Sequence, residues 1–283
     1  MILPVQKTKA LVLGYHPLGE ADKIISFLTK DFGYIRAVGK GARRIKNKLC
    51  GRLEIMTYGD LVFYERTDKD LHIINTFDII EHFQELRENL TKIAYCSYLA
   101  ELIQQIETPG VQNTEIFNLL LNIMVMMRGQ DDPELLARIF ELRLLASAGL
   151  SPKLDSCVLC TSYITPGNSE SLSVKGVTGL RFSVADGGIL CCDCGNNFSQ
   201  QKNRTQTIGA VITISRGTLE LMKRLQNAPL ELLARLKMLD SSRAEIRRIT
   251  RNFISYHMDR GKFRSLDFLE SIEKDDLETI KQV

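Results

Sequence analysis

The stretch "KIISFLTKDFGYIRAVGKG" at residues 23–41 holds two runs rich in Ile, Val, Phe and Tyr around an Asp31-Phe32-Gly33 turn. This pattern predicts a hairpin of two strands. Three similar runs, "KALVLGY", "DLVFYER" and "LHIINTFDII", lie within the first eighty residues, with turn-forming residues at 16–19, 58–60 and 68–70. Five short strands in about eighty residues predict a small antiparallel barrel, since the turns are too short for crossover helices.

After Glu81 the apolar residues change to helical spacing. We expect helices at 90–106, at 114–129 ending at Gly129, and from Asp132-Pro133 to a stop at Gly149. Helical patterns return at 215–224, 229–239 and 241–257, and the end of the chain is expected to fray. We interpret Met124, Met126 and Met127 as core residues, the alternative being a binding groove.

The composition is that of a globular protein with nearly balanced charge. The chain has 283 residues, 44% of them hydrophobic and 25% charged, with a formal net charge of +3. So small a net charge indicates a nucleic-acid partner only if the cations are clustered. No apolar run approaches the roughly 18 residues of a membrane span, and the N-terminus lacks a signal-peptide pattern. We therefore expect a cytoplasmic protein.

Five of the seven cysteines lie in two short motifs, "CVLC" at 157–160 and "CCDC" at 191–194. Two C-x-x-C pairs, each near a turn, predict a tetrahedral zinc site. The predicted ligands are Cys157, Cys160, Cys191 and Cys194, with Cys192 as an alternative to Cys191. Four thiolates leave no open position for water, so we expect one structural zinc ion rather than a catalytic one.

The cations are concentrated between residues 36 and 52, where no Asp or Glu occurs. A small barrel with a cationic loop is typical of proteins that bind single strands, because cations contact phosphates while aromatic side chains stack on bases. The predicted phosphate-binding residues are Arg36, Lys40, Arg43, Arg44, Lys46, Lys48 and Arg52. The alternative is a solvated charged loop. One or two of a set of aromatic residues are expected to face solvent: Phe27, Phe32, Tyr34, Phe63 and Tyr64.

Three stretches together carry a resemblance to a known family. "GEADKIISFLTKDFGYIRAVGKGARRIKNK", "RIFELRLLASAGLSPKLDSC" and "KFRSLDFL" resemble the N-terminal signature, the helical segment and the C-terminal ending of the bacterial recombination mediator family RecO. Arg264 stands where lysine is usual, and the long stretch between Cys160 and Cys191 and the Cys191-Cys192 doublet depart from the pattern. The resemblance spans nearly the whole chain.

This resemblance implies an α+β multidomain protein. It implies an OB-fold barrel at 1–80, a helical bundle domain at 81–155 and 199–283, and an inserted four-cysteine zinc module at 156–198. It further implies a nucleoid-associated, non-enzymatic protein that is a monomer alone. Such a protein binds single- and double-stranded DNA, anneals complementary strands and, with RecR, helps load RecA onto strands coated by single-strand-binding protein (SSB).

One partner-binding residue is expected on the helical segment. The SSB tail is acidic with an apolar end, so it needs an apolar pocket edged by a cation. Arg138 matches an arginine of the family's helical segment, and we expect it to contact this tail. The alternative is an exposed ion pair of Arg138 with Glu134 or Glu141, because these spacings suit a helix.

Two other classes of function remain open from the sequence. One is an RNA-binding or transcription-associated zinc protein, which matched DNA and RNA oligomers would distinguish. The other is a metal-dependent nuclease, which needs an open metal centre held by carboxylates. The acidic pairs at 131–132 and 275–276 are interpreted as helix capping and solvation, and the four scattered histidines are assigned no catalytic role.

Overall fold

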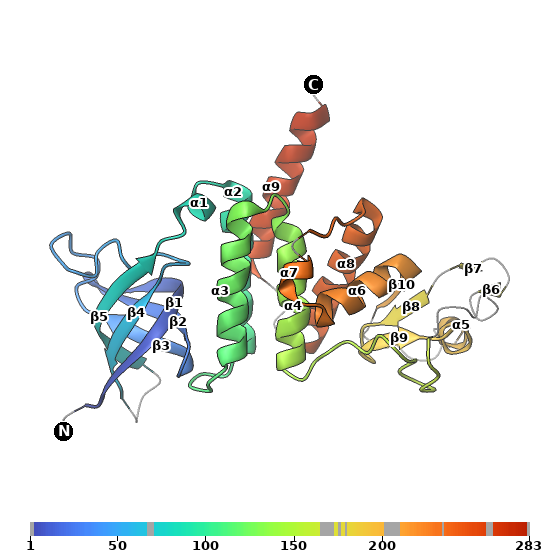
Figure 1. The fold of residues 1–283 in the computed structure, drawn as a ribbon, viewed down its shortest axis with the longest axis horizontal. Helices are drawn as coiled ribbons and strands as arrows, with labels where there is room; N and C mark the ends of the chain where they lie inside the picture. Colours follow the sequence, from blue (N-terminus) through green and yellow to red (C-terminus); the bar gives the residue numbers. More distant parts are fainter. Residues whose placement is uncertain are drawn as a thin grey trace. The chain divides into compact units, whose positions relative to one another are not determined.

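The computed structural model describes residues 3–66, 71–164, 173–174, 177–178, 180–200, 210–233, 235–258 and 263–281. The chain divides into two compact units, which are described separately (Figure 1). Unit 1 contains residues 1–137 and 263–283, and unit 2 contains residues 138–262.

Unit 1 begins with a closed barrel of five strands. These are β1 (Val5–Leu18), β2 (Asp22–Thr29), β3 (Gly33–Gly39), β4 (Tyr58–Tyr64) and β5 (Leu71–Glu81). The order around the barrel is β1-β2-β3-β5-β4, and β1 pairs with β4 to close it. This arrangement confirms the OB-fold expectation. One pairing differs from a purely antiparallel barrel: β3 and β5 run parallel, because strand direction cannot alternate all the way round a closed barrel of five strands.

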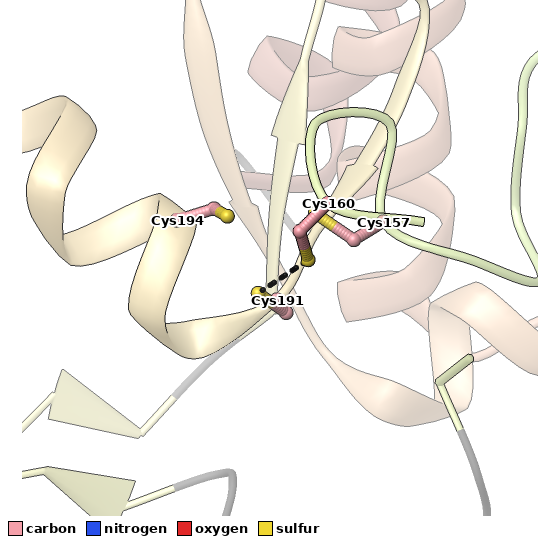
Figure 2. A group of neighbouring side chains, drawn as sticks. All are labelled: Cys157, Cys160, Cys191 and Cys194. Carbon is pink, nitrogen blue, oxygen red and sulfur yellow. Dashed lines mark hydrogen bonds between the residues drawn. The ribbon is translucent and has the colours of Figure 1, made fainter. Parts of the chain in front are cut away.

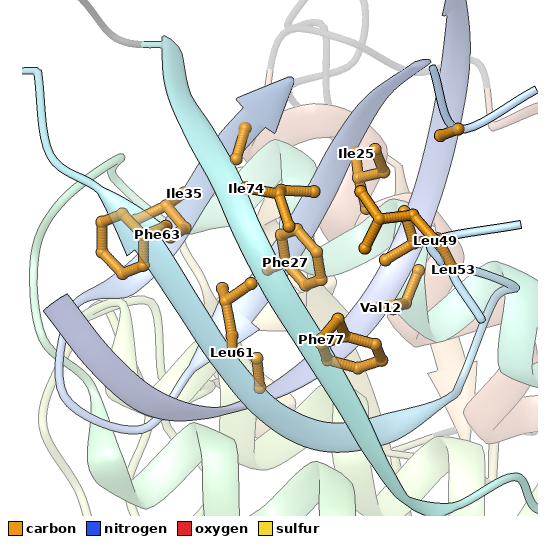
Figure 3. Packing of buried hydrophobic residues seen from close by; sticks show 13 residues of the cluster. Val12, Ile25, Phe27, Ile35, Leu49, Leu53, Leu61, Phe63, Ile74 and Phe77 are labelled. Carbon is orange, nitrogen blue, oxygen red and sulfur yellow. The ribbon is translucent and has the colours of Figure 1, made fainter. Parts of the chain in front are cut away.

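The barrel interior is filled by every second residue of its strands, as period-two alternation requires (Figure 3). Ala10 and Val12 of β1, for example, are both fully buried. Ala42, Leu49 and Leu53 come from the segment between β3 and β4 and join the same core. The cationic segment is therefore attached to the barrel by its own apolar residues.

Two glycines show where the backbones approach closely. The expected turn at 58–60 is wrong, because Gly59 lies inside β4, where a Cβ would sit 2.4 Å from the Asp78 carbonyl oxygen of β5. The Asp31-Phe32-Gly33 turn is confirmed, and Gly33 takes the φ of 62° that favours glycine. A Cβ there would clash with the Val111 carbonyl group. The expected turn at 68–70 lies outside the described residues.

The helices of unit 1 include two that follow the expected pattern, at 90–106 and 114–129, and two that were not predicted from the sequence, at 84–87 and 264–281. They are α1 (Gln84–Arg87), α2 (Leu90–Ile106), α3 (Thr114–Gly129) and α9 (Arg264–Lys281), and α4 (Pro133–Ser147) continues into unit 2. Asn89 and Asn113 cap α2 and α3 by accepting hydrogen bonds from Lys92 N and Ile116 N. Met124 and Met127 are fully buried and Met126 partly, so the core interpretation of this cluster is confirmed.

Unit 2 combines a small sheet with helices. Its three-stranded sheet has the order β10-β8-β9, from β8 (Leu180–Ser183), β9 (Gly188–Leu190) and β10 (Val211–Ile214). Two short strands, β6 (Ser173–Val174) and β7 (Val177–Thr178), form a separate pair. The helices are α5 (Cys192–Gln200), α6 (Arg216–Asn227), α7 (Leu230–Leu233) and α8 (Asp240–His257). The expected helix at 229–239 is thus only four residues long.

Among the described residues, no helix is both long and apolar enough to cross a membrane.

Candidate nucleic-acid interface and metal centre

We call residues 40–52 the cationic loop; it connects β3 toward β4. All seven predicted phosphate-binding residues, six of them within this loop, have exposed side chains. Arg36 projects outward from β3 between the buried Ile35 and Ala37. The barrel and its cationic loop therefore present all seven cations at the surface of unit 1.

Hydrogen bonds hold the base of the cationic loop. Gly41 N donates to Asp22 Oδ1 at 2.7 Å, and Asn47 Nδ2 donates to the Lys40 carbonyl at 2.9 Å. Arg43 N donates to the Ala21 carbonyl at 3.0 Å, and its guanidinium donates to the Gly19 carbonyl at 3.0 Å. These hydrogen bonds fix the loop to the β1–β2 hairpin, although its like charges repel one another.

The acidic residues near the loop have partners of their own. Asp78 pairs with Arg52 at 3.3 Å, and Glu54 pairs with Lys23 at 3.6 Å. Within the described part of the chain, no carboxylate lies within 4.0 Å of the charged nitrogens of five cations: Lys40, Arg43, Arg44, Lys46 and Lys48. Their charge is available to an external anion.

The aromatic residues of the barrel lie differently from the expectation. Phe27, Tyr34 and Phe63 are buried, while Phe32 and Tyr64 are only half-buried. The more exposed ring is Tyr15 on β1, at 42%, with Lys23 Nζ 3.6 Å from its centroid. The alternation of buried and exposed residues along β1 does not predict the exposure of Tyr15. The β1–β2 register shifts between Val12 and Gly14, so the alternation is interrupted just before this residue.

The four predicted cysteine ligands meet in unit 2 (Figure 2). The Sγ atoms of Cys157, Cys160, Cys191 and Cys194 all lie within 4.8 Å of one another, and those of Cys160 and Cys191 are 3.6 Å apart. Thiolates about 2.3 Å from a zinc ion lie roughly 3.8 Å apart, so this group fits a tetrahedral metal with little adjustment. Cys192 lies outside the group, which favours Cys191 over the alternative.

Local backbone pairing explains why the two motifs meet. Val158 N donates to the Ile189 carbonyl and Ile189 N to the Lys153 carbonyl, at 2.9 and 3.0 Å, so the first motif lies against β9. Cys191 follows β9 directly, and α5 carries Cys194. A Cβ at Gly188 would sit 2.4 Å from the Lys153 carbonyl oxygen, so this close pairing requires a glycine.

The ionisation of the thiols is uneven. Hydrogen bonding with Ser162 and Cys157 lowers the pKa of Cys160 to about 6. Burial has the largest effect on the Cys194 thiol and raises its pKa, and the neighbouring cysteines raise it further. Four thiolates this close repel one another, and a divalent cation removes that repulsion.

Arg138 lies in the interior and not on the surface. Its side chain is 0% exposed, and Nη1 donates to both carboxylate oxygens of Glu141 at 2.7 Å and to Thr250 Oγ1 at 2.9 Å. The expectation that it contacts a partner's tail is therefore wrong, because a guanidinium buried and held in this way is not accessible. Pairing with Glu141 is confirmed, but in a buried form.

Comparison with known proteins covers nearly the whole chain. Family models described as "Recombination protein O N terminal" and "Recombination protein O C terminal" match residues 1–83 and 87–267.

The chain belongs to the RecO family.

Relatives named "DNA repair protein RecO" come from several bacteria. That of Alkaliphilus metalliredigens is 31% identical over 269 residues, covering 94% of this chain and 99% of the relative. That of Pelotomaculum thermopropionicum is 30% identical over 95% of this chain and 94% of the relative. Membership of the RecO family gives the chain a role in DNA repair and recombination, and the barrel matched by the N-terminal model carries the cationic loop.

Proposed function

We propose that the chain binds single- and double-stranded DNA through the cationic loop and Arg36, and anneals complementary strands without catalysing a covalent reaction. The observation that carries this proposal is the group of exposed cations without carboxylate partners in the described structure. Phosphate neutralisation lets two strands approach that otherwise repel each other.

The partners follow from family membership rather than from a surface of this chain. We propose that, with RecR, the protein helps load RecA onto SSB-coated single strands, and that it is a nucleoid-associated cytoplasmic monomer when alone. Contact with the SSB tail belongs to this proposal, through a surface that excludes the buried Arg138.

The cysteine group supports a structural metal. We propose one zinc ion held by Cys157, Cys160, Cys191 and Cys194, because four thiols surround one point. Bound there, the ion would cross-link the two C-x-x-C motifs, and four sulfur ligands would complete a tetrahedral site.

The salt dependence of DNA binding tests the interface. A plot of the logarithm of the DNA-binding constant against the logarithm of the salt concentration has a slope of roughly −0.7 for each phosphate contact on a single strand. Five contacts therefore correspond to a salt slope of about −3.5. Arg44→Ala with Lys46→Ala should flatten the slope by about 1.4, equally for all sequences, because phosphate contacts carry no base information. Arg43 is left intact because it also anchors the loop at Gly19.

The matched control is Arg235→Ala with Lys237→Ala, which removes the same charges from exposed positions in unit 2. Its slope should equal that of the wild type. An unchanged slope in the loop variant, or an equal change in both variants, would place the DNA elsewhere. Tighter binding of a matched RNA oligomer would favour the RNA-binding alternative.

A nuclease is less well supported. Asp132 Oδ1 accepts a hydrogen bond from Leu135 N at 3.0 Å at the start of α4, so it acts as a helix cap. The side chains of Asp275 and Asp276 lie outside the described part. Strand cleavage on addition of magnesium would overturn the non-enzymatic proposal.

A further inference from the structure

Ile45 stands out from the surface of the cationic loop. Its side chain is 93% exposed, the largest exposure among the large apolar residues of the described chain. Asn47 N donates to the Arg44 carbonyl at 2.9 Å, so Ile45 and Lys46 take the two corner positions of a β-turn. Such corners ordinarily hold Gly, Pro, Asn, Asp or Ser, and a β-branched aliphatic residue gains nothing there from the fold.

The turn that carries Ile45 is held in place from both sides. Asn47 bridges the loop, since its Nδ2 donates to the Lys40 carbonyl while its Oδ1 accepts from Leu49 N at 2.8 Å. Leu49 is in turn anchored in the barrel core (Figure 3). The exposed side chain therefore projects from a turn with a defined conformation.

The surroundings of Ile45 specify what it can meet. Arg44 and Lys46 flank it, both exposed and without an ion pair in the described structure, so an anionic partner is attracted to the turn. The cations attract a polyanion, and Ile45 needs an apolar surface to contact. DNA offers both, because its flat bases lie between its charged phosphates. Apolar side chains that enter between base steps are a known way of unstacking them.

We propose that Ile45 is a wedge that inserts between adjacent bases of the strand whose phosphates Arg44 and Lys46 contact. This inference rests on the proposed DNA-binding function and deepens it. Burial of the isoleucine against base faces offsets part of the cost of unstacking. The separated bases are left unstacked on the protein, which prepares them to pair with a complementary strand.

The test uses a single-stranded oligonucleotide with a fluorescent adenine analogue whose emission is quenched by stacking. Binding of wild type should raise the emission. Ile45→Ala should lose this rise and bind roughly four- to fifteenfold more weakly, as expected when one or two methylene groups lose burial. Its salt slope should stay unchanged, because the cations remain. Ile45→Leu, which keeps the apolar volume, should retain the rise.

Ile80 supplies the matched control, because it is also an exposed isoleucine of the barrel, at 48%. Ile80→Ala should bind and fluoresce as wild type, and thermal melting should show all variants folded. Two results overturn the role of Ile45 but not DNA binding by the loop. One is an emission rise that persists in Ile45→Ala. The other is wild-type protein that binds with the expected salt slope but causes no emission rise. Absence of salt-dependent binding by the wild type overturns the proposed function as well.

Discussion

A guanidinium with no access to water must be compensated by its neighbours, and in unit 2 Glu141 and Thr250 do this for Arg138. Arg138 and Glu141 lie one turn apart on α4, whereas Thr250 lies on α8. The interaction therefore links two helices far apart in the chain. Its net contribution to folding is small, since desolvation of both charges opposes their attraction, but removal of one partner leaves the other charge buried and unpaired.

We expect Arg138→Ala to lower the free energy of unfolding by about 3–5 kcal/mol. The double variant Arg138→Met with Glu141→Leu should lose less, because the buried charge of Glu141 is removed together with its partner. Urea denaturation would measure both.

The exposed pair Lys9–Asp60, 3.0 Å apart, is the control. Lys9→Ala should cost only about 0–1 kcal/mol. If Arg138→Ala is no more destabilising than Lys9→Ala, the pair is more solvated than the structure indicates.

At the scale of elements, the start of α9 depends on a carboxylate from α2. Glu101 accepts hydrogen bonds from Arg264 N at 3.1 Å, Ser265 N at 3.0 Å and the Ser265 hydroxyl. The two amides are backbone donors of the first turn, which have no partner within the helix itself, and the negative charge suits the positive end of the helix dipole. The ring of Phe263 packs against Tyr98 of α2 next to this cap.

Glu101→Ala should therefore weaken the docking of α9 by about 0.5–2 kcal/mol, the range for loss of an N-terminal cap. Hydrogen exchange of the α9 amides should accelerate, while that of the barrel amides stays as in wild type. Glu101→Gln keeps an acceptor oxygen and should lose less. Equal protection of α9 in wild type and in Glu101→Ala would show that packing of Phe263 and Leu269 suffices.

The sequence predicted elements where one local signal dominates. Helix α2 was expected at 90–106 and lies there, because Asn89 caps it and its apolar spacing is regular. The parallel pairing of β3 with β5 was not predicted, since it depends on how the barrel closes and not on either strand alone. Spacing likewise placed Arg138 beside Glu141 but could not show that α8 covers both. For the cysteines spacing sufficed, because a tight turn at the first motif and the first turn of α5 at the second aim the sulfurs at one point.

At the scale of the whole molecule, the two candidate sites belong to different units. The cationic loop is part of the barrel in unit 1, and the cysteine group lies in unit 2, where it joins the first C-x-x-C turn to the start of α5. Each unit has its own buried residues. We therefore expect the metal to stabilise unit 2 without altering the charge that the loop presents.

Metal analysis of the purified protein should find one zinc ion for each chain, and Cys157→Ser should lose it. The apparent free energy of structural zinc binding in zinc-finger peptides is about 10–16 kcal/mol, so the loss should loosen the described residues around the site, 153–164 and 188–195. Cys192→Ser is the matched control, because this thiol lies next to a ligand but outside the group. Its zinc content should equal that of wild type. Equal loss of zinc in both variants would show that the four ligands are wrongly assigned. A wild-type protein that is folded but contains no zinc would show that the cysteine group is not a zinc site.

The same site should depend on pH, and the sign follows from its ligands. Zinc binds thiolates, so protons compete with it. Hydrogen bonding with Ser162 lowers the pKa of the Cys160 thiol, but burial raises that of the Cys194 thiol, so zinc should be released progressively as the pH falls below neutral. A chelator at neutral pH should have the same effect on unit 2. In both treatments the salt slope of DNA binding, measured after return to neutral pH, should match that of untreated protein, because the loop cations lie in unit 1. A slope that flattens with zinc loss would show that the metal module itself contacts the phosphates.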